Sequence, residues 1–108
     1  LLQNTKKDKL FDWLFKDRES TQVEAEYSNK SSTVVIDRMF IENDILWIID
    51  FKTARPKEDE NIGDFIEHQK IFHRKQLMEY KDILQGVFNL PTKVALYCPA
   101  VSKLVNFD

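Results

Sequence analysis

The chain has 108 residues, of which 43% are hydrophobic and 31% charged, a balance typical of one globular domain or of a piece of a larger one. The net charge of −2 excludes a protein that holds nucleic acid by bulk positive charge. A single cysteine excludes an intrachain disulfide framework and a cysteine-rich zinc site, and no apolar run predicts a membrane span.

The first half of the chain predicts one helix followed by three strands. Residues 9–17 are densely apolar and predict a short buried helix, whereas residues 22–28 alternate as in a half-buried strand. Residues 33–42 and 45–53 are rich in Val, Ile, Phe and Trp. Between them lies Asn43-Asp44, a pair that tolerates the positive φ of a tight turn, so we predict a β-hairpin.

The second half predicts a surface loop and a long helix. Residues 54–63 are polar, and Asp64 with Glu67 three residues later has the spacing of a capping box. We therefore predict a helix over residues 65–86, ended by Gly86 and Pro91.

Two short strands complete the predicted order, one over residues 93–97 and one over residues 104–107 that pairs back with it. The order α-β-β-β-α-β-β predicts an α/β domain with a mixed central sheet and flanking helices.

Two aspartates and a lysine are brought together by the predicted hairpin. A two-residue turn at Asn43-Asp44 places Asp37 directly opposite Asp50, and Lys52 shares their face because side chains alternate. The remaining residues of that face are then apolar: Val35, Met39, Ile41, Leu46 and Ile48.

Opposed carboxylates on an apolar face are costly, and a divalent cation would offset the cost. Mg²⁺ or Mn²⁺ held by Asp37 and Asp50, with Lys52 beside it, suits phosphodiester hydrolysis. The alternative is an ordinary ion cluster in which Lys52 simply neutralises the pair.

Three segments resemble one known family. They are Val35-Ile36-Asp37-Arg38, Trp47-Ile48-Ile49-Asp50-Phe51-Lys52-Thr53 and Gln76-Leu77-Met78-Glu79-Tyr80. In this order they resemble the RecB-like nuclease domains of the PD-(D/E)XK superfamily, which lie in the C-terminal region of UvrD/Rep-type helicase–nucleases. The resemblance covers roughly residues 20 to 97 and implies a restriction-endonuclease-like core.

The resemblance also implies the roles of individual residues. Asp37 and Asp50 match the metal-binding aspartates and Lys52 the catalytic lysine, while Gln76 and Tyr80 match the helix motif beside the active site. The family carries a further acidic residue on the preceding strand, a place that Glu24 or Glu26 could fill.

The implied activity is that of a Mg²⁺- or Mn²⁺-dependent DNA exonuclease domain of an ATP-dependent helicase–nuclease, in DNA end processing and recombinational repair. The implied partners are DNA, helicase domains of the same chain and a second helicase–nuclease subunit, in the bacterial cytoplasm and away from the membrane.

The family's upstream metal-binding His has no counterpart in Leu1 to Arg18, so we expect residues 1–108 to be one nuclease-like domain, truncated at its N-terminus. A non-catalytic DNA-binding or scaffolding domain that retains the nuclease fold is the alternative.

A basic patch on the long helix is a candidate contact for DNA phosphates. Lys70, Arg74 and Lys75 lie within six residues of one another. The alternative is a solvated helix face whose cations pair with neighbouring Glu residues. For His68 and His73 on the same helix we expect structural or solvated roles, because their spacing is not that of a zinc pair.

Overall fold

The computed structural model describes residues 5–107 and has eight elements in chain order. They are α1 (Thr5–Phe15), β1 (Gln22–Ser28), β2 (Thr33–Glu42), β3 (Ile45–Phe51), α2 (Ile62–Phe88), β4 (Thr92–Cys98), the 3-10 turn η2 (Pro99–Val101) and β5 (Lys103–Phe107). The predicted α-β-β-β-α-β-β order is confirmed. The element ends differ: α1 begins at Thr5 and ends at Phe15, and β3 ends at Phe51, two residues before its predicted end.

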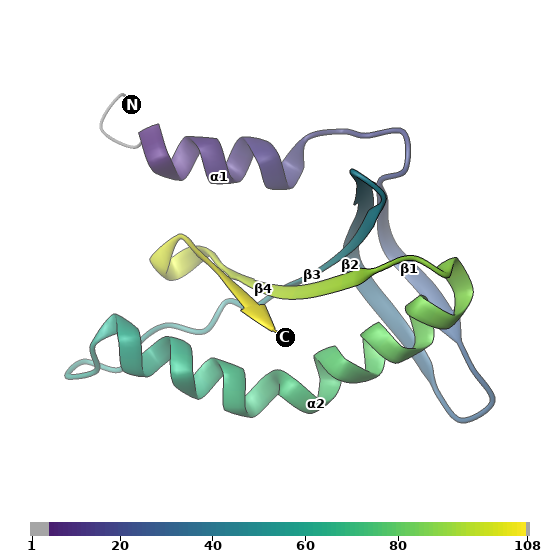
Figure 1. Ribbon diagram of the computed structural model, residues 1–108. Coiled ribbons are helices and arrows are strands. Elements are labelled where there is room, and N and C mark those ends of the chain that lie inside the picture. The colour runs from purple at the N-terminus through teal and green to yellow at the C-terminus, as the bar shows by residue number, and fades with distance from the viewer. Residues whose placement is uncertain (1–4, 108) are drawn as a thin grey trace.

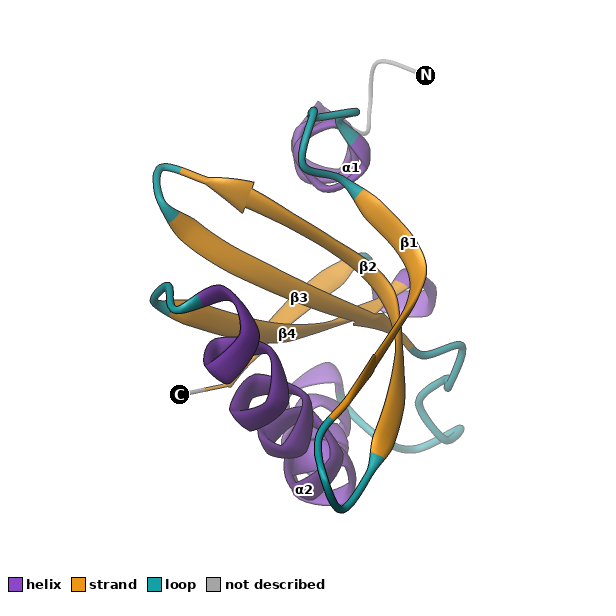
Figure 2. Ribbon diagram, turned by 90° about the vertical axis from the view of Figure 1, so that its right-hand side faces the viewer, coloured by secondary structure: helices purple, strands orange, loops and turns teal. Residues whose placement is uncertain are grey.

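The five strands form one mixed sheet in the order β1-β2-β3-β4-β5. β3 and β4 pair in parallel, and the other neighbouring strands are antiparallel. A parallel pair needs a long crossover connection, and α2 supplies it between β3 and β4. Figure 1 shows the sheet between the two helices, and Figure 2 shows α1 and α2 on opposite sides of it. The chain is therefore an α/β domain.

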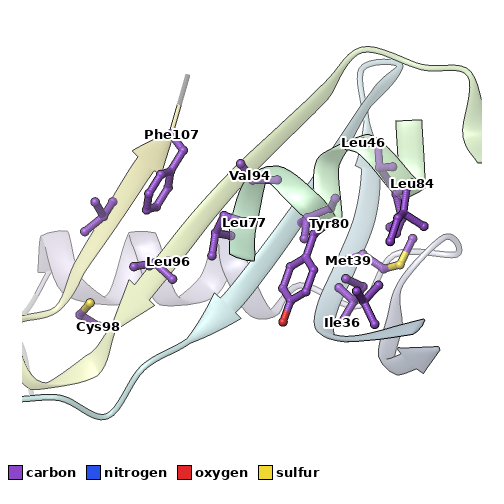
Figure 3. Close-up of a cluster of buried hydrophobic side chains, with 14 of the residues drawn as sticks. Ile36, Met39, Leu46, Leu77, Tyr80, Leu84, Val94, Leu96, Cys98 and Phe107 are labelled. Carbon is purple, nitrogen blue, oxygen red and sulfur yellow. The ribbon is translucent and has the colours of Figure 1, made fainter. Parts of the chain in front are cut away.

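Each face of the sheet has its own hydrophobic core. On one face Leu77 and Tyr80 of α2 lie in one core with Ile36 and Leu46 of the strands (Figure 3). Phe65 of α2 belongs to the same core. On the other face Leu14 of α1 packs with Phe40, Ile49, Ala95 and Tyr97. β3 and β4 lie inside the sheet and are covered on both sides, which explains their almost continuous apolar runs.

The predicted hairpin between β2 and β3 is confirmed, and its register holds from Arg38 opposite Ile49 to the turn, one pair short of the predicted pairing of Asp37 with Asp50. Asn43 and Asp44 both have positive φ, 52° and 61°, as a tight two-residue turn requires. Met39 pairs with Ile48, which is the register that such a turn imposes.

The predicted composition of the apolar face is wrong at one residue, because the alternation of β2 changes phase near Asp37. Ile36 and Met39, three apart, both lie in the core under α2, although strict alternation would put them on opposite faces. Val35, expected on the apolar face, is instead 50% exposed. The pairing is irregular at the same place in β1, where Glu24 has a left-handed φ of 48° between paired neighbours.

Both predicted ends of α2 are wrong. The N-cap is Asn61, whose side-chain oxygen accepts a hydrogen bond from the Asp64 backbone N–H, so Asp64 lies in the first turn. Gly86 lies inside the helix, which continues to Phe88 and ends at Asn89 with a left-handed φ of 54°. Asn also tolerates this conformation, so glycine is not required there.

The end of α1 is tied to β2 by a polar network. The Trp13 indole N–H donates to Glu42 Oε1 at 2.7 Å, and Arg18 forms an ion pair with Glu42 Oε2 at 2.9 Å. The Arg18 guanidinium also lies 3.8 Å from the centroid of the Phe40 ring. These donors lower the pKa of Glu42, the Trp13 hydrogen bond having the largest effect. No helix among residues 5–107 is long and apolar enough to cross a membrane.

Candidate functional site

The two aspartates meet where β2 and β3 diverge. Asp50 follows Leu46 and Ile48 on the alternating face of β3 that α2 covers, and it is only 4% exposed. Asp37 is half-buried, and its Oδ2 accepts a hydrogen bond from the Phe51 backbone N–H at 2.8 Å. The carboxylate of Asp37 is therefore turned across the strand gap towards β3, beside Asp50.

Lys52 joins this pair from the end of β3. Its Nζ lies 3.1 Å from Oδ2 of Asp50 and donates a hydrogen bond of 3.4 Å to Oε1 of Gln76 on α2. Its backbone N–H donates to the Tyr97 carbonyl at 3.0 Å, so the pairing with β4 continues past the end of β3. The structure therefore brings the side chains of Asp37, Asp50 and Lys52 together, although the two aspartates lie just beyond the last paired residues of β2 and β3.

Asp50 is harder to ionise than an ordinary aspartate, because its pKa is raised. The pKa of Asp50 is raised from 3.8 to about 6: burial raises it most, the neighbouring Asp37 carboxyl also raises it, and Lys52 opposes the rise. The ion pair with Lys52 therefore only partly offsets the cost of burying Asp50 beside a second carboxylate.

Helix α2 contributes three side chains to the same region. Gln76 contacts Lys52 directly, and Tyr80 is buried one turn further along. Burial raises the pKa of Tyr80 to about 12, with smaller contributions from Asp50 and Asp37, so its hydroxyl stays protonated at neutral pH. Burial and the Lys52 ammonium lower the pKa of His73, which keeps its ring neutral there.

The two glutamates of β1 differ in position. Glu24 lines a hollow of about 470 Å³ that Asp37 also lines, together with Phe15, Val23, Arg38 and Phe51. Glu26 is exposed on β1 and does not line this hollow. Of the two alternatives that the sequence left open, Glu24 is therefore the one beside Asp37.

The three candidate DNA-binding cations of α2 do not all lie on one side of the helix: Lys70 and Arg74 are one turn apart, and Lys75 points to a different side. Arg74 lies with its guanidinium 5.6 Å from the Phe107 ring of β5, whereas Lys75 borders a depression with Asn29 and Ser32 of the β1–β2 turn. Lys70 is half-buried one turn before Arg74. A role of these residues in DNA binding stays a prediction.

The sequence reasoning missed two groups at the site, the backbone N–H of Phe51 and the side chain of His73. His73 precedes Gln76 by three residues, so helical spacing could have indicated that the two share a face. The hydrogen bond from Phe51 to Asp37 has no sequence signal, because it depends on how the two strands separate. His68 lies elsewhere, exposed and paired with Glu60 at 2.6 Å.

The donor set fits a hard divalent cation held by two carboxylates. Among the residues that the structure describes, no group of three or more His, Cys, Asp or Glu side chains is placed to hold a metal. Mg²⁺ is nevertheless commonly bound by one or two carboxylates, with water and substrate oxygens completing its shell. Oδ2 of Asp50 is buried, and the Lys52 ammonium 3.1 Å away is the partner that the structure gives it, so a bound ion would share this oxygen with Lys52.

No model of a known protein family matches this chain, and no curated protein is significantly similar to it.

Proposed function

We propose that this chain is a metal-dependent DNA nuclease domain that hydrolyses phosphodiester bonds. The proposal rests mainly on the surroundings of Asp50. This buried carboxyl group has a raised pKa, lies beside Asp37 and is 3.1 Å from the Lys52 ammonium. Groups with perturbed pKa values and a specific charged partner are concentrated at functional sites.

Asp37 and Asp50 are the residues that would hold Mg²⁺ or Mn²⁺. The chemistry that such an ion supplies is polarisation of a phosphoryl oxygen and a lower pKa for a bound water. The Phe51 N–H fixes Asp37 in place for this role, because it holds Oδ2 of the carboxylate at 2.8 Å.

Lys52 is the residue that stabilises developing negative charge. Its ammonium has three N–H donors, so it can keep its contacts with Asp50 and Gln76 and still donate to a phosphoryl oxygen. Gln76 orients the flexible lysine, which makes Gln76 a positioning residue.

Two neighbouring side chains of α2, Tyr80 and His73, affect the charge and hydrogen bonding at the site. Tyr80 is a hydrogen-bond donor that does not ionise near neutral pH, and His73 adds no positive charge beside Lys52.

We place this domain in a UvrD/Rep-type helicase–nuclease that processes DNA ends in recombinational repair in the bacterial cytoplasm. This placement rests on the resemblance of the three sequence segments and includes helicase domains of the same chain and a second subunit as partners.

A second candidate function is a non-catalytic DNA-binding or scaffolding domain with the same fold. It is favoured by the acidic balance of the chain and by the lack of a third metal-ligating side chain at the carboxylate pair among residues 9–107.

Metal-dependent stability separates the two candidates in the 108-residue chain. Mn²⁺ at about 100 times its Kd should add roughly 2.7 kcal/mol to the free energy of unfolding. Asp37→Asn should remove this gain, while the exposed Asp82→Asn should keep it. Equal Mn²⁺ stabilisation of wild type and Asp37→Asn would contradict the proposed site.

Cleavage itself is tested in the helicase–nuclease that contains this domain. Asp50→Ala should abolish hydrolysis of linear DNA and leave ATP hydrolysis intact. Undiminished DNA cleavage by Asp50→Ala would refute the assignment and favour the scaffolding function.

A further inference from the structure

We propose that the hollow beside Asp37 binds one nucleobase of the substrate strand, next to the phosphodiester held at the carboxylate pair. This inference rests on the proposed nuclease function and deepens it. The hollow lies on the α1 side of the sheet and is lined by Phe15, Val23, Glu24, Asp37, Arg38 and Phe51. Its volume of about 470 Å³ is within the range of sites that take small molecules.

The apolar part of the hollow suits the flat face of a base. The rings of Phe15 and Phe51 lie 5.6 Å apart at 32°, so α1 and β3 together provide an aromatic surface. Val23 adds an aliphatic side chain that is 58% exposed and so is open to contact with a base. Aromatic surfaces bind bases of single strands by stacking, largely independently of sequence.

Arg38 makes this surface rigid and supplies positive charge. Its Nε donates to the Leu14 carbonyl at 2.9 Å, and an Nη donates to the Lys16 carbonyl at 3.1 Å. The guanidinium lies 5.2 Å from the centroid of the Phe15 ring. These hydrogen bonds hold the end of α1 against β2. The positive charge of Arg38 also offsets the negative charges of Glu24 and Asp37 in the hollow, which would otherwise repel an approaching phosphate.

Glu24 gives the hollow a hydrogen-bond acceptor for the edge of a base. Its backbone φ of 48° is left-handed, a conformation that glutamate rarely adopts and that persists where the surroundings demand it, often at binding sites. A carboxylate accepts from exocyclic amino groups, as in the pairing of Glu with cytosine N4. We therefore expect cytosine to bind better than thymine, which has a carbonyl at the same position.

Asp37 connects this hollow to the catalytic groups. It lines the hollow and, on its other side, accepts from Phe51 and adjoins Asp50. A nucleotide whose base fills the hollow therefore has its phosphate beside Asp37 and Asp50.

Amide chemical shifts of the 108-residue chain test the proposal without any cleavage. In Mg²⁺, dCMP should shift the amides of Val23 and Glu24 in addition to those near Asp37 and Asp50. Deoxyribose 5-phosphate, which has no base, should shift only the amides near Asp37 and Asp50. We expect dTMP to bind at least threefold more weakly than dCMP.

Two valines make a matched pair of variants. Val23→Asp adds a charge in the hollow and should weaken dCMP binding at least tenfold, whereas Val35→Asp, on the neighbouring strand and 50% exposed, should change it less than twofold. Glu24→Gln should reduce the preference of dCMP over dTMP and leave the fold intact.

The outcomes separate the two proposals. Identical shifts with dCMP and deoxyribose 5-phosphate, or equal effects of the two valine variants, would overturn the base site. If Mg²⁺ alone leaves the amides of Asp37 and Asp50 unshifted while dCMP still shifts Val23, the proposed metal site fails and the base site stands.

Discussion

Replacing Asp50 by Asn should stabilise the metal-free chain at neutral and alkaline pH, although it destroys the proposed metal site. In the folded chain the pKa of Asp50 is about 6, against 3.8 for an unperturbed Asp. Ionising this carboxyl group is therefore harder in the folded state than in the unfolded state, and its charge weakens folding. Asn has nearly the same shape and carries no charge.

The magnitude follows from the size of the pKa shift. A shift of about two units corresponds to about 3 kcal/mol, because each unit is worth about 1.4 kcal/mol. Asn also loses the attraction of Lys52, 3.1 Å away, so we expect a net gain of about 1–3 kcal/mol at pH 8. In a domain of this size that gain raises Tm by at least roughly 4 °C.

The pH dependence identifies the cause. Below pH 3.8 the carboxyl is protonated in both states and costs nothing. Wild-type stability then falls relative to Asp50→Asn as the pH rises through about 6, and the difference stays constant above that. Urea unfolding in a chelating buffer between pH 4.5 and 8 measures it, with the exposed Asp82→Asn as the control.

Two results would refute this reasoning. Asp50→Asn could be less stable than wild type at pH 8, which would mean that the ion pair with Lys52 outweighs the burial of the charge. Alternatively, the stability difference could be the same at pH 4.5 and pH 8, in which case its source would not be ionisation of Asp50.

Three further predictions concern the fold. Gly86→Ala should raise the free energy of unfolding by about 0.5–1 kcal/mol in urea, because Gly86 lies inside α2 and an added Cβ would meet no atom within 4 Å. Leu77→Ala should lower it by about 2–5 kcal/mol, because Leu77 is fully buried under the sheet; the exposed Val87→Ala should change it by less than about 0.5 kcal/mol. Glu42→Gln should lower the free energy of unfolding by about 1 kcal/mol at pH 7 and by less at pH 3. The reason is that the lowered pKa of Glu42 adds stability only while its carboxylate is ionised. An equal loss at both pH values would mean that the charge of Glu42 does not contribute.

The elements of this fold were predictable because its local signals are strong and agree. The Asn43-Asp44 turn, flanked by apolar strands, specifies both the hairpin and its register. The ends of α2 were harder, because several polar residues near the start could cap it. Asn61 and Asp64 are both good N-caps, and only the path of the preceding loop decides between them.

The candidate site was predictable to the extent that it depends on hairpin register. Register alone brings Asp37 towards Asp50, and alternation adds Lys52. The phase change in β2 could not be predicted, because apolar residues stand at both alternating sets of its positions and do not mark where the alternation shifts. It arises where Asp37 accepts from the Phe51 N–H and where Glu24 takes a left-handed backbone, and both depend on the separation of three strands.

The phase change in β2 explains how the Asp37 side chain can contact groups on both faces of the sheet. In a regular strand Asp37 would share one face with Val35 and Met39. Because the phase changes there, Met39 lies under α2, Val35 is exposed, and Asp37 reaches Asp50 while still lining the hollow on the α1 side. A base on one side of the sheet and a phosphate at the strand gap can then be held by neighbouring groups. The irregular backbone at Glu24 and the buried charge at Asp50 both weaken folding, and both lie where the proposed function needs them.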